Sequence, residues 1–285
     1  MSKLKIAVQK SGRLNEDSLK LLKDCGISIN NGKGQLKAES SNFPLEVLYL
    51  RNSDIPQYIE DGVADIAIVG ENGLIDKRSD LKIVERLGFS KCRVSLAVPK
   101  DADYTGIEWF EGKKLATSYI NTIQDYFDSK GINCEYHQIS GSVEIAPNIG
   151  LADGICDIVE SGSTLFKNGL KEVTTILKSE AVLVSNNNLS AEKQAILDKM
   201  VFRIKAVLKG KKSKYVLLNA PINKVDEISA ILPGMKSPTV TPLAEEGWCS
   251  LQTVIEENQF WEIIDALKEA GAEGILIMPI EKIVL

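Results

Sequence analysis

The sequence of 285 residues lacks several residue patterns that mark whole classes of protein. It has one histidine, His137, which excludes every mechanism that needs two histidines. Its five cysteines are scattered singly with no C-x-x-C pair, so neither a zinc site nor a disulfide framework is expected. An odd number of cysteines in a chain of this length fits a reducing compartment, and we expect a cytoplasmic protein.

Long hydrophobic runs are also missing. No window approaches about 18 consecutive apolar residues, so we expect no membrane span and no membrane partner. The N-terminal segment lacks the apolar stretch of a signal peptide. The net charge of −5 argues against a broad nucleic-acid surface, so we expect no nucleic-acid partner. The 44% apolar and 26% charged composition is ordinary for a globular protein, and the length suggests two or three domains.

The common catalytic and nucleotide-binding motifs are absent. The glycines and lysines from Gly106 to Lys113 have the wrong spacing for a P-loop, and the segment 32–34 lacks the third glycine of the dinucleotide fingerprint. There is no G-x-S-x-G elbow and no H-E-x-x-H zinc motif. We therefore expect no covalent catalytic residue and no dedicated protein metal site.

What the chain does contain is a polar loop after a buried strand. The apolar run 155–159 includes Asp157 and is followed by Glu160 and then by hydroxyl and glycine residues, Ser161, Gly162, Ser163 and Thr164. A helix is expected to start at about Leu165, so backbone N–H groups, glycine and hydroxyls together predict an anion site. Carboxylates repel phosphate but accept hydrogen bonds from sugar hydroxyls, so the pattern favours a phosphorylated sugar. The alternative is an ordinary capped strand–turn–helix corner.

A second corner of this kind lies near the N-terminus. A strand over 5–9 is followed by Lys10, Gly12 and Arg13, and Asn15 is the expected N-cap of the next helix. Two cations beside a glycine at the end of a strand are suited to neutralise phosphates, arginine through a bidentate fork. The alternative is that both cations are simply solvated.

Three further residues follow predicted strands and are weaker candidates for nucleotide binding. Arg51 follows the strand 45–50, Glu71 lies in a predicted tight turn at 70–73, and Tyr119 follows a short strand. Glu71 has an equally simple interpretation as a helix cap.

The alternation of strands and helices predicts parallel βαβ units in two lobes before about residue 180. A strand at 180–184 is expected to return to the first lobe. We also expect a helix at 145–151 and a flexible basic linker at 209–214. The remainder has the β-α-β-β-α-β order of a ferredoxin-like module.

Taken together, these segments resemble the ATP phosphoribosyltransferase family, the first enzymes of histidine biosynthesis, in its long form. The resemblance covers essentially the whole chain. It rests on the segments QKSGRL (9–14), RNSDIP (51–56), GENGL (70–74), LATSY (115–119), GSVEIAP (141–147), ADGICDIVESGSTLFKNGL (152–170), SPTVTPLAEEGW (237–248) and IMPIEKI (277–283).

This resemblance implies an α/β fold of two periplasmic-binding-protein-like lobes with a catalytic cleft, plus a C-terminal ferredoxin-like (ACT-like) regulatory domain. Lobe I is expected at 1–93 plus about 180–208, lobe II at 94–179, and the regulatory domain at 213–285.

The implied reaction is glycosyl transfer: ATP and phosphoribosyl pyrophosphate give N1-(5-phosphoribosyl)-ATP and pyrophosphate, with Mg2+ as cofactor. L-Histidine is the implied feedback inhibitor, and homo-oligomers from dimer to hexamer are expected. Mg2+ is expected mainly on pyrophosphate oxygens and water.

The resemblance distributes roles over the candidate residues. The loop Ser161–Thr164 is assigned to the 5′-phosphate, with Asp157 and Glu160 on the ribose hydroxyls. The remaining assignments are Lys10 and Arg13 for pyrophosphate or the ATP phosphates, Arg51, Glu71 and Tyr119 for the nucleotide, and Asn219, Met235 and Thr239 for histidine. The last three have an alternative as a subunit contact.

Two competing functions stay open at this point. A two-lobed chain with a cleft is also the design of a solute-binding protein without chemistry. A purely regulatory amino-acid sensor is the other alternative, although it leaves residues 1–180 unexplained.

Overall fold

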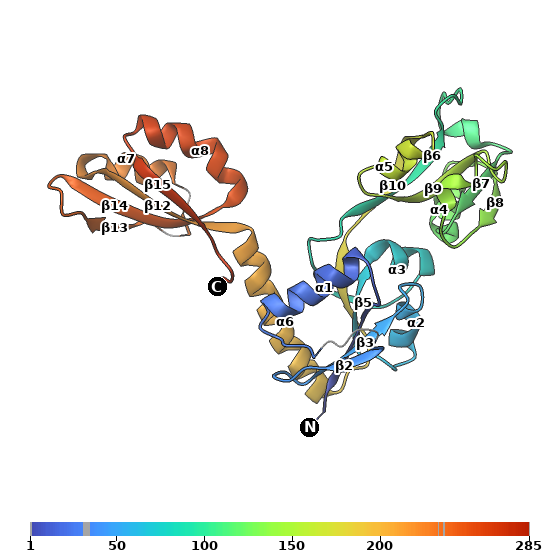
Figure 1. Cartoon of the computed structure of the whole chain (residues 1–285), viewed down its shortest axis with the longest axis horizontal. Helices are drawn as coiled ribbons and strands as arrows, with labels where there is room; N and C mark the ends of the chain where they lie inside the picture. The colour runs from blue at the N-terminus through green and yellow to red at the C-terminus, as the bar shows by residue number, and fades with distance from the viewer. Residues whose placement is uncertain (1, 31–34, 233, 236, 285) are drawn as a thin grey trace. The chain divides into compact units, whose positions relative to one another are not determined.

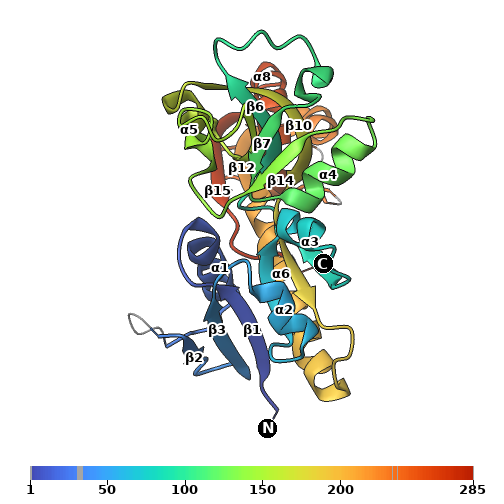
Figure 2. The same cartoon turned by 90° about the vertical axis from the view of Figure 1, so that its right-hand side faces the viewer.

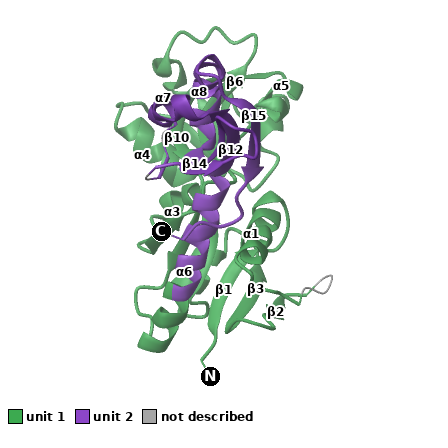
Figure 3. Ribbon diagram, turned by 90° about the vertical axis from the view of Figure 1, so that its left-hand side faces the viewer, with its two compact units in different colours: residues 1–198 green, residues 199–285 purple. Residues whose placement is uncertain are grey.

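The computed structural model describes residues 2–30, 35–232, 234, 235 and 237–284. It divides into two compact units, residues 1–198 and 199–285 (Figure 3). The first unit contains two β-sheets with short helices, and the second contains one sheet with helices (Figure 1). No helix in the described part of the chain is long and apolar enough to cross a membrane.

The first sheet of unit 1 has the strand order β2-β3-β1-β4-β11-β5. Its central strand β1 pairs in parallel with β3 and β4, whereas β2, β11 and β5 add antiparallel pairings. The strands are β1 (Leu4–Gln9), β2 (Lys37–Glu39), β3 (Leu45–Leu50), β4 (Ile66–Gly70), β5 (Lys82–Arg86) and β11 (Ala181–Ser185), and the helices are α1 (Arg13–Asp24), α2 (Ile55–Glu60) and α3 (Glu71–Lys77). Each helix follows the carboxyl end of a parallel strand, so the loops between them gather at one edge of the sheet (Figure 2).

The second sheet of unit 1 has the strand order β10-β6-β9-β7-β8. Strands β7, β8 and β9 run parallel, whereas β6 is antiparallel to both β9 and β10. The elements are β6 (Cys92–Pro99), β7 (Lys114–Thr117), β8 (Glu135–Gln138), β9 (Gly154–Val159), β10 (Leu170–Ser179), α4 (Ile120–Asp128), α5 (Ser163–Lys167) and two 3-10 turns at Ile107–Phe110 and Val143–Ile145. Fully buried Phe110 and Phe127 stack with ring centroids 5.5 Å apart beneath this sheet, which fixes α4 against it.

The chain passes from the first sheet to the second after β5 and returns after β10. The returning strand β11 joins the first sheet, as the sequence predicted for 180–184. It lies between β4 and β5, a position that was not predicted, and its five residues are all buried. Two sheets joined by a double crossing confirm the predicted two-lobed α/β class.

Unit 2 has the antiparallel strand order β13-β14-β12-β15, which is the ferredoxin-like arrangement that the sequence predicted. The elements are α6 (Ala191–Lys211), which crosses the division between the units, β12 (Ser213–Pro221), a 3-10 turn at Ile222–Lys224, α7 (Val225–Ile231), β13 (Thr239–Pro242), β14 (Trp248–Glu256), α8 (Glu257–Glu269) and β15 (Glu273–Pro279). Alternate residues of β12, Val216, Leu218 and Ala220, are fully buried in the core with α7 and α8. The alternation shows that this sheet has one core face.

Several local predictions were wrong. The helix expected at 145–151 is a 3-10 turn that ends at Ile145, because Pro147 has no N–H and Gly150 has φ +74°. The turn expected at 70–73 is the first turn of α3. The linker expected at 209–214 is structured, with only Lys212 between α6 and β12.

The prediction of parallel units throughout was also wrong. Strand β10 was not expected, and both sheets are mixed. Strand β10 is ten residues long and is interrupted by two register shifts, at Glu172/Thr174 and Thr175/Leu177. These irregularities obscure the period-two pattern by which a strand is recognised in sequence.

Candidate functional site

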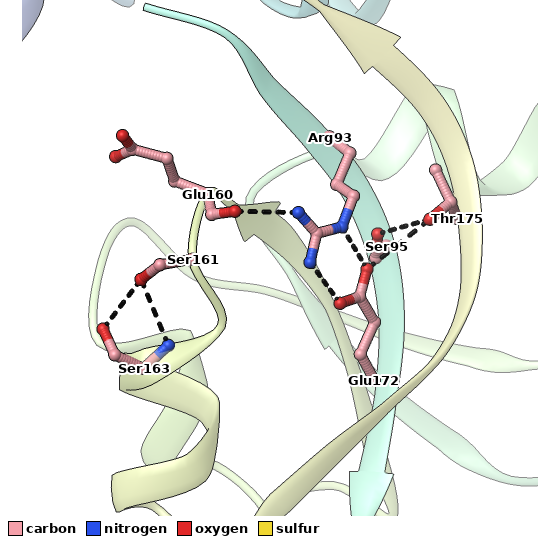
Figure 4. Close-up of polar contacts among 7 residues, drawn as sticks. All are labelled: Arg93, Ser95, Glu160, Ser161, Ser163, Glu172 and Thr175. Carbon is pink, nitrogen blue, oxygen red and sulfur yellow. Dashed lines mark hydrogen bonds and ion pairs between the residues drawn. The ribbon is translucent and has the colours of Figure 1, made fainter.

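The loop after β9 has the geometry of an anion cradle. Gly162 adopts φ +78°, a left-handed conformation that glycine takes without strain, and precedes Ser163, the first residue of α5. The Ser161 hydroxyl donates to the Ser163 hydroxyl over 3.0 Å, and the Ser163 N–H donates back to Ser161 Oγ over 3.4 Å (Figure 4). Within the described residues the N–H groups of Ser161 and Gly162 have no protein acceptor. This loop therefore offers free donors, which is what a phosphate needs.

The helix after this loop is short. It covers five residues and begins at Ser163 rather than at Leu165, so Ser163 and Thr164 belong to its first turn. Both side chains are exposed. The anion-binding capacity of this corner therefore comes from the loop itself more than from a helix.

Asp157 lies on β9 and is partly buried. Burial raises the pKa of its carboxyl to about 6, although the Ile158 N–H, 2.8 Å from Oδ1, acts in the opposite direction. Tyr119 lies nearby, and burial together with the Asp157 carboxylate raises the pKa of its phenol. The structure thus brings together Asp157, which was assigned to the ribose hydroxyls, and Tyr119, which was assigned to the nucleotide.

The corner after β1 also turns at a glycine with positive φ, but its backbone conformation differs, because ψ is −179° at Gly12 and 0° at Gly162. Gly12 has φ +89° and is the N-cap of α1, which begins at Arg13. Asn15, expected as the cap, lies inside the helix, and its side-chain amide donates to the Gln9 carbonyl over 2.6 Å. Lys10 and Arg13 flank the glycine, so the predicted basic corner is present with a different cap.

The two corners meet within unit 1. The guanidinium of Arg13 forms an ion pair with the carboxylate of Glu160, and both side chains are more than half exposed. Two residues that are 147 positions apart in sequence and were assigned to different parts of the ligand are thus in contact.

Glu71 is held by a neighbour. Arg86 makes two hydrogen bonds to its carboxylate, at 2.7 and 2.5 Å, and lies 3.6 Å from Glu180. This group lines a cavity of about 550 Å³ that also contains Arg93 and Glu160. Glu71 therefore faces the predicted site, with both carboxylate oxygens already bonded.

A second cavity, of about 300 Å³, lies at the ends of β3, β7 and β8. It is lined by Asn52, Ser53, Pro56, Gly73, Asp76, Lys77, Ser118, Tyr119, Ser140 and Gly141. Arg51 directly follows β3 and is exposed beside these residues in sequence. Ligands in open α/β sheets bind outside the carboxyl ends of strands, which is where this cavity lies.

The three residues predicted for histidine are not all together. Asn219 pairs with Ser250, and Thr239 pairs with Gln252, so Asn219 and Thr239 lie on the same face of the unit 2 sheet. Met235 is 54% exposed and lines a different cavity, of about 240 Å³, with Lys209 and Gln259.

Two residues that sequence reasoning missed are Arg93 and Glu172. Arg93 on β6 makes a bidentate ion pair with Glu172 on β10 and also contacts the loop after β9 (Figure 4). No local signal marks them, because the pairing depends on an antiparallel strand that the sequence did not predict.

Comparison with known proteins agrees with the family resemblance that the sequence shows. A family model described as ATP phosphoribosyltransferase matches residues 51–206, and one described as HisG, C-terminal domain, matches residues 210–282. An ATP phosphoribosyltransferase from Cytophaga hutchinsonii is 58% identical over 99% of this chain and 98% of its own length. One from Phocaeicola vulgatus is 56% identical over 99% of this chain and its whole length.

A solved structure is similar to part of the chain. One chain of the ATP phosphoribosyl transferase (HisG:HisZ) complex from Thermotoga maritima is 31% identical, with a TM-score of 0.61. The match covers 70% of this chain and 98% of that one.

Proposed function

This chain belongs to the ATP phosphoribosyltransferase family of histidine biosynthesis, and we propose that its two glycine corners form the two ends of one substrate site. The observation that carries this proposal is the ion pair between Arg13 and Glu160, which joins the corners across two sheets. A transferase must hold a phosphorylated sugar and its leaving pyrophosphate at the same time, and this geometry offers a place for each.

The corner after β9 is proposed to bind phosphoribosyl pyrophosphate. The free N–H groups of Ser161 and Gly162, with the hydroxyls of Ser161, Ser163 and Thr164, suit the 5′-phosphate. Asp157 and Glu160 are carboxylates at the edge of this cradle and suit the ribose hydroxyls. With a pKa of about 6, Asp157 is mostly ionised at neutral pH and accepts hydrogen bonds.

The corner after β1 is proposed to bind the pyrophosphate. Lys10 and Arg13 are cations of the type that stabilise charge on a departing phosphate oxygen. In the ligand-free chain Arg13 and Glu160 neutralise one another. On binding, pyrophosphate replaces Glu160 as the partner of Arg13, and a ribose hydroxyl replaces Arg13 as the partner of Glu160.

The chemistry then needs no covalent residue. The adenine N1 of ATP forms a bond to C1 of the ribose while the bond from C1 to the pyrophosphate oxygen breaks, through an oxocarbenium-like transition state. Such a step depends on positioning and on neutralisation of the developing charge. We assign the cavity beside Tyr119 to the nucleotide, with Arg51, which precedes the lining residue Asn52, as a further contact. Glu71 lines the other cavity, and we propose that it contacts the nucleotide from there.

Mg2+ is proposed to enter with the substrate. The described residues contain no group of three or more His, Cys, Asp or Glu side chains placed to hold a metal. Magnesium often keeps several waters and binds through substrate phosphates, so pyrophosphate oxygens are its proposed ligands.

Histidine inhibition is proposed to act through unit 2. Asn219 and Thr239 lie on one sheet face and present an amide and a hydroxyl suited to an amino-acid ligand. We further propose that the chain acts as a homo-oligomer, from dimer to hexamer, with lobe I at 1–93 plus about 180–208 and lobe II at 94–179.

The test is turnover by the purified full chain. ATP, phosphoribosyl pyrophosphate and Mg2+ are mixed with pyrophosphatase, and the ultraviolet absorbance of the N1-substituted adenine is followed. We expect turnover that stops on chelation of Mg2+ and is suppressed by L-histidine. Binding of phosphoribosyl pyrophosphate without turnover returns the chain to the solute-binding interpretation, and turnover that histidine does not affect removes the sensor role of unit 2.

A further inference from the structure

The carbonyl group at the start of the phosphate loop is held by a side chain from another strand. Arg93 Nη1 donates to the Glu160 carbonyl oxygen over 2.8 Å, from a position on β6 directly beside the end of β9. Figure 4 shows the Glu160 carbonyl directed at Arg93 while its carboxylate points away from it. Arg93 thus contacts the backbone of the loop and not the Glu160 carboxylate, which pairs with Arg13.

The orientation of Arg93 is set by Glu172. Arg93 Nε and Nη2 each donate to a Glu172 carboxylate oxygen over 2.5 Å, which is the bidentate geometry that fixes a guanidinium plane. The Arg93 guanidinium holds the pKa of the Glu172 carboxyl below its usual value, so the pair stays charged.

A chain of hydroxyls supports the carboxylate from the other side. The Ser95 hydroxyl donates to Thr175 Oγ1 over 3.4 Å, and the Thr175 hydroxyl donates to Glu172 Oε1 over 3.5 Å (Figure 4). Glu172 and Thr175 each flank a register shift in β10. Shifts of this kind re-aim side chains, and here they lie next to Glu172, which binds Arg93, and next to Thr175, which donates to Glu172.

The consequence for the loop follows from peptide geometry. A trans peptide unit is planar, with its C=O and N–H pointing in opposite directions. With the Glu160 carbonyl directed at Arg93, the N–H of Ser161 must point away from Arg93. Gly162, the next residue but one, does little to restrain this peptide, because glycine accepts many conformations.

We propose that Arg93, oriented by Glu172, is a positioning residue that sets the Glu160–Ser161 peptide so that the Ser161 N–H is available to the 5′-phosphate. This inference rests on the proposed function, because it assigns a cause to the geometry of the same loop. Arg93 makes no contact with substrate in this role. Its effect is therefore expected on affinity for phosphoribosyl pyrophosphate and not on affinity for ATP.

The decisive variant is Arg93→Lys. Lysine keeps the positive charge but lacks the planar fork, so it cannot bind both Glu172 oxygens and the Glu160 carbonyl together. We expect the Kd for phosphoribosyl pyrophosphate with Mg2+, measured by calorimetry, to rise about 10- to 100-fold, the effect of losing a charge-assisted hydrogen bond. The KM for ATP should change less than about threefold.

Glu172→Gln tests the same network from its other end. Glutamine has nearly the shape of glutamate but presents only one acceptor to the arginine fork. We expect a rise in the same Kd of about 3- to 10-fold, in the same direction and smaller, because Arg93 retains one acceptor and the carbonyl. This variant also decides the matter if Arg93→Lys does not fold.

Arg78→Lys is the matched control. Arg78 makes one hydrogen bond, of 2.6 Å, to Asp125, and both side chains are 60% exposed, so lysine can reproduce the contact. Its Kd should equal that of the unmodified chain. If the unmodified chain binds no phosphoribosyl pyrophosphate, the proposed function is overturned and this inference with it. If the unmodified chain, Arg93→Lys and Glu172→Gln all bind phosphoribosyl pyrophosphate equally well, the positioning role alone is overturned. A loss of thermal stability in the two variants would then show that Arg93 and Glu172 have a purely structural role.

Discussion

The two glycine corners of unit 1 have the same order of elements, a strand, a glycine with positive φ and a helix. They differ in the residues that hold the corner in place. In each, a buried strand ends, a glycine with positive φ forms the N-cap, and a helix begins at the next residue. The corner at Gly12 carries two cations, whereas the corner at Gly162 carries hydroxyls and follows two carboxylates. The two turns differ in conformation, with ψ −179° at Gly12 and 0° at Gly162, and in the side chains that they present, which is why the proposed function gives them different parts of the substrate.

In each corner a side chain donates a hydrogen bond to a carbonyl group of the segment before the glycine. The two corners differ in how far along the chain that side chain lies. The Gln9 carbonyl is held by Asn15, six residues away, from within α1. The Glu160 carbonyl is held by Arg93, 67 residues away, from a neighbouring strand. The helices that follow the corners also differ in length, since α1 has 12 residues and α5 has five. A long helix stabilises its own first turn, and a short one depends on tertiary contacts.

The largest expected effect comes from removing the charge that distinguishes the first corner. Arg13→Met should lower kcat about 100- to 1000-fold, because one donor to developing charge is lost from the transition state. Thermal stability should barely change, since exposed ion pairs contribute little. Initial rates and thermal melts of Arg13→Met are compared with those of Lys20→Met, which removes an exposed cation from the same helix. Equal kcat values for the two variants would remove Arg13 from the site.

The next largest effect is expected from Asp157, one of the two carboxylates that precede the Gly162 corner. Burial raises the pKa of Asp157 from 3.8 to about 6, so the folded chain binds this proton more tightly than the unfolded chain. The contribution of Asp157 to the free energy of unfolding should therefore fall as the pH rises from about 4 to 6, by up to about 3 kcal/mol.

Asp157→Asn should remove this pH dependence while weakening sugar binding. Urea unfolding across this pH range should show a flatter profile for the variant than for the unmodified chain. The kcat/KM for phosphoribosyl pyrophosphate should rise through about pH 6 in the unmodified chain only, because the ionised carboxylate accepts the hydroxyls. Parallel stability profiles together with an unchanged kcat/KM would show that Asp157 neither titrates in this range nor binds the sugar.

Substituting the two glycines tests whether the two corners serve different steps. Gly162→Ala should cost about 1–2 kcal/mol of stability, since alanine is strained in the left-handed region. Gly12→Ala should cost about 1–3 kcal/mol, because φ +89° with ψ −179° is a region that essentially only glycine adopts. Space is not the cause, because an added Cβ lies 3.6 Å from Gln9 and 3.9 Å from Val159 respectively. The Gly162 variant should mainly raise the KM for phosphoribosyl pyrophosphate, and the Gly12 variant should mainly lower kcat.

Gly131→Ala is the control for this pair. Gly131 has φ +68° and an open Cβ position, and it lies after α4, away from both corners in sequence. It should show the same loss in thermal melts with unchanged kinetics. A kinetic change of equal size in all three variants would mean that backbone strain acts through global stability.

The smallest effect is expected from the local anchor. Asn15→Ala removes the hydrogen bond to the Gln9 carbonyl and should lower the free energy of unfolding by about 1 kcal/mol, as measured in urea. The Kd for phosphoribosyl pyrophosphate should not change, in contrast to Arg93→Lys. A rise in this Kd comparable with that of Arg93→Lys would erase the distinction between local and distant anchoring.

Features that depend on near neighbours could be predicted from the sequence. Strands β1, β3 and β9 are mostly apolar, and the two glycine corners follow β1 and β9. The ferredoxin-like order of unit 2 was also predictable, because its strands and helices alternate at clear periods. The ion pair of Arg13 and Glu160 was not predicted, because the two residues were assigned to different groups, Glu160 to the ribose and Arg13 to pyrophosphate or the ATP phosphates.

Features that depend on pairing across the chain could not be predicted. Asn15 was expected at the cap because its residue type favours caps, but Gly12 takes the position, since its positive φ ends the strand and starts the helix. Glu71 was expected to contact the nucleotide or to cap a helix, and only the fold places Arg86 against it.

The sequence by itself therefore determined the chemistry of the two corners: which residues are cationic, which are hydroxyls, and where glycine permits the turn. The tertiary structure alone decided how the second corner is held. Strand β10 runs antiparallel to β6, and two register shifts bring Glu172 to Arg93. A hydrogen bond between residues 79 positions apart cannot be predicted from the local sequence pattern, because its geometry depends on strand pairing and register.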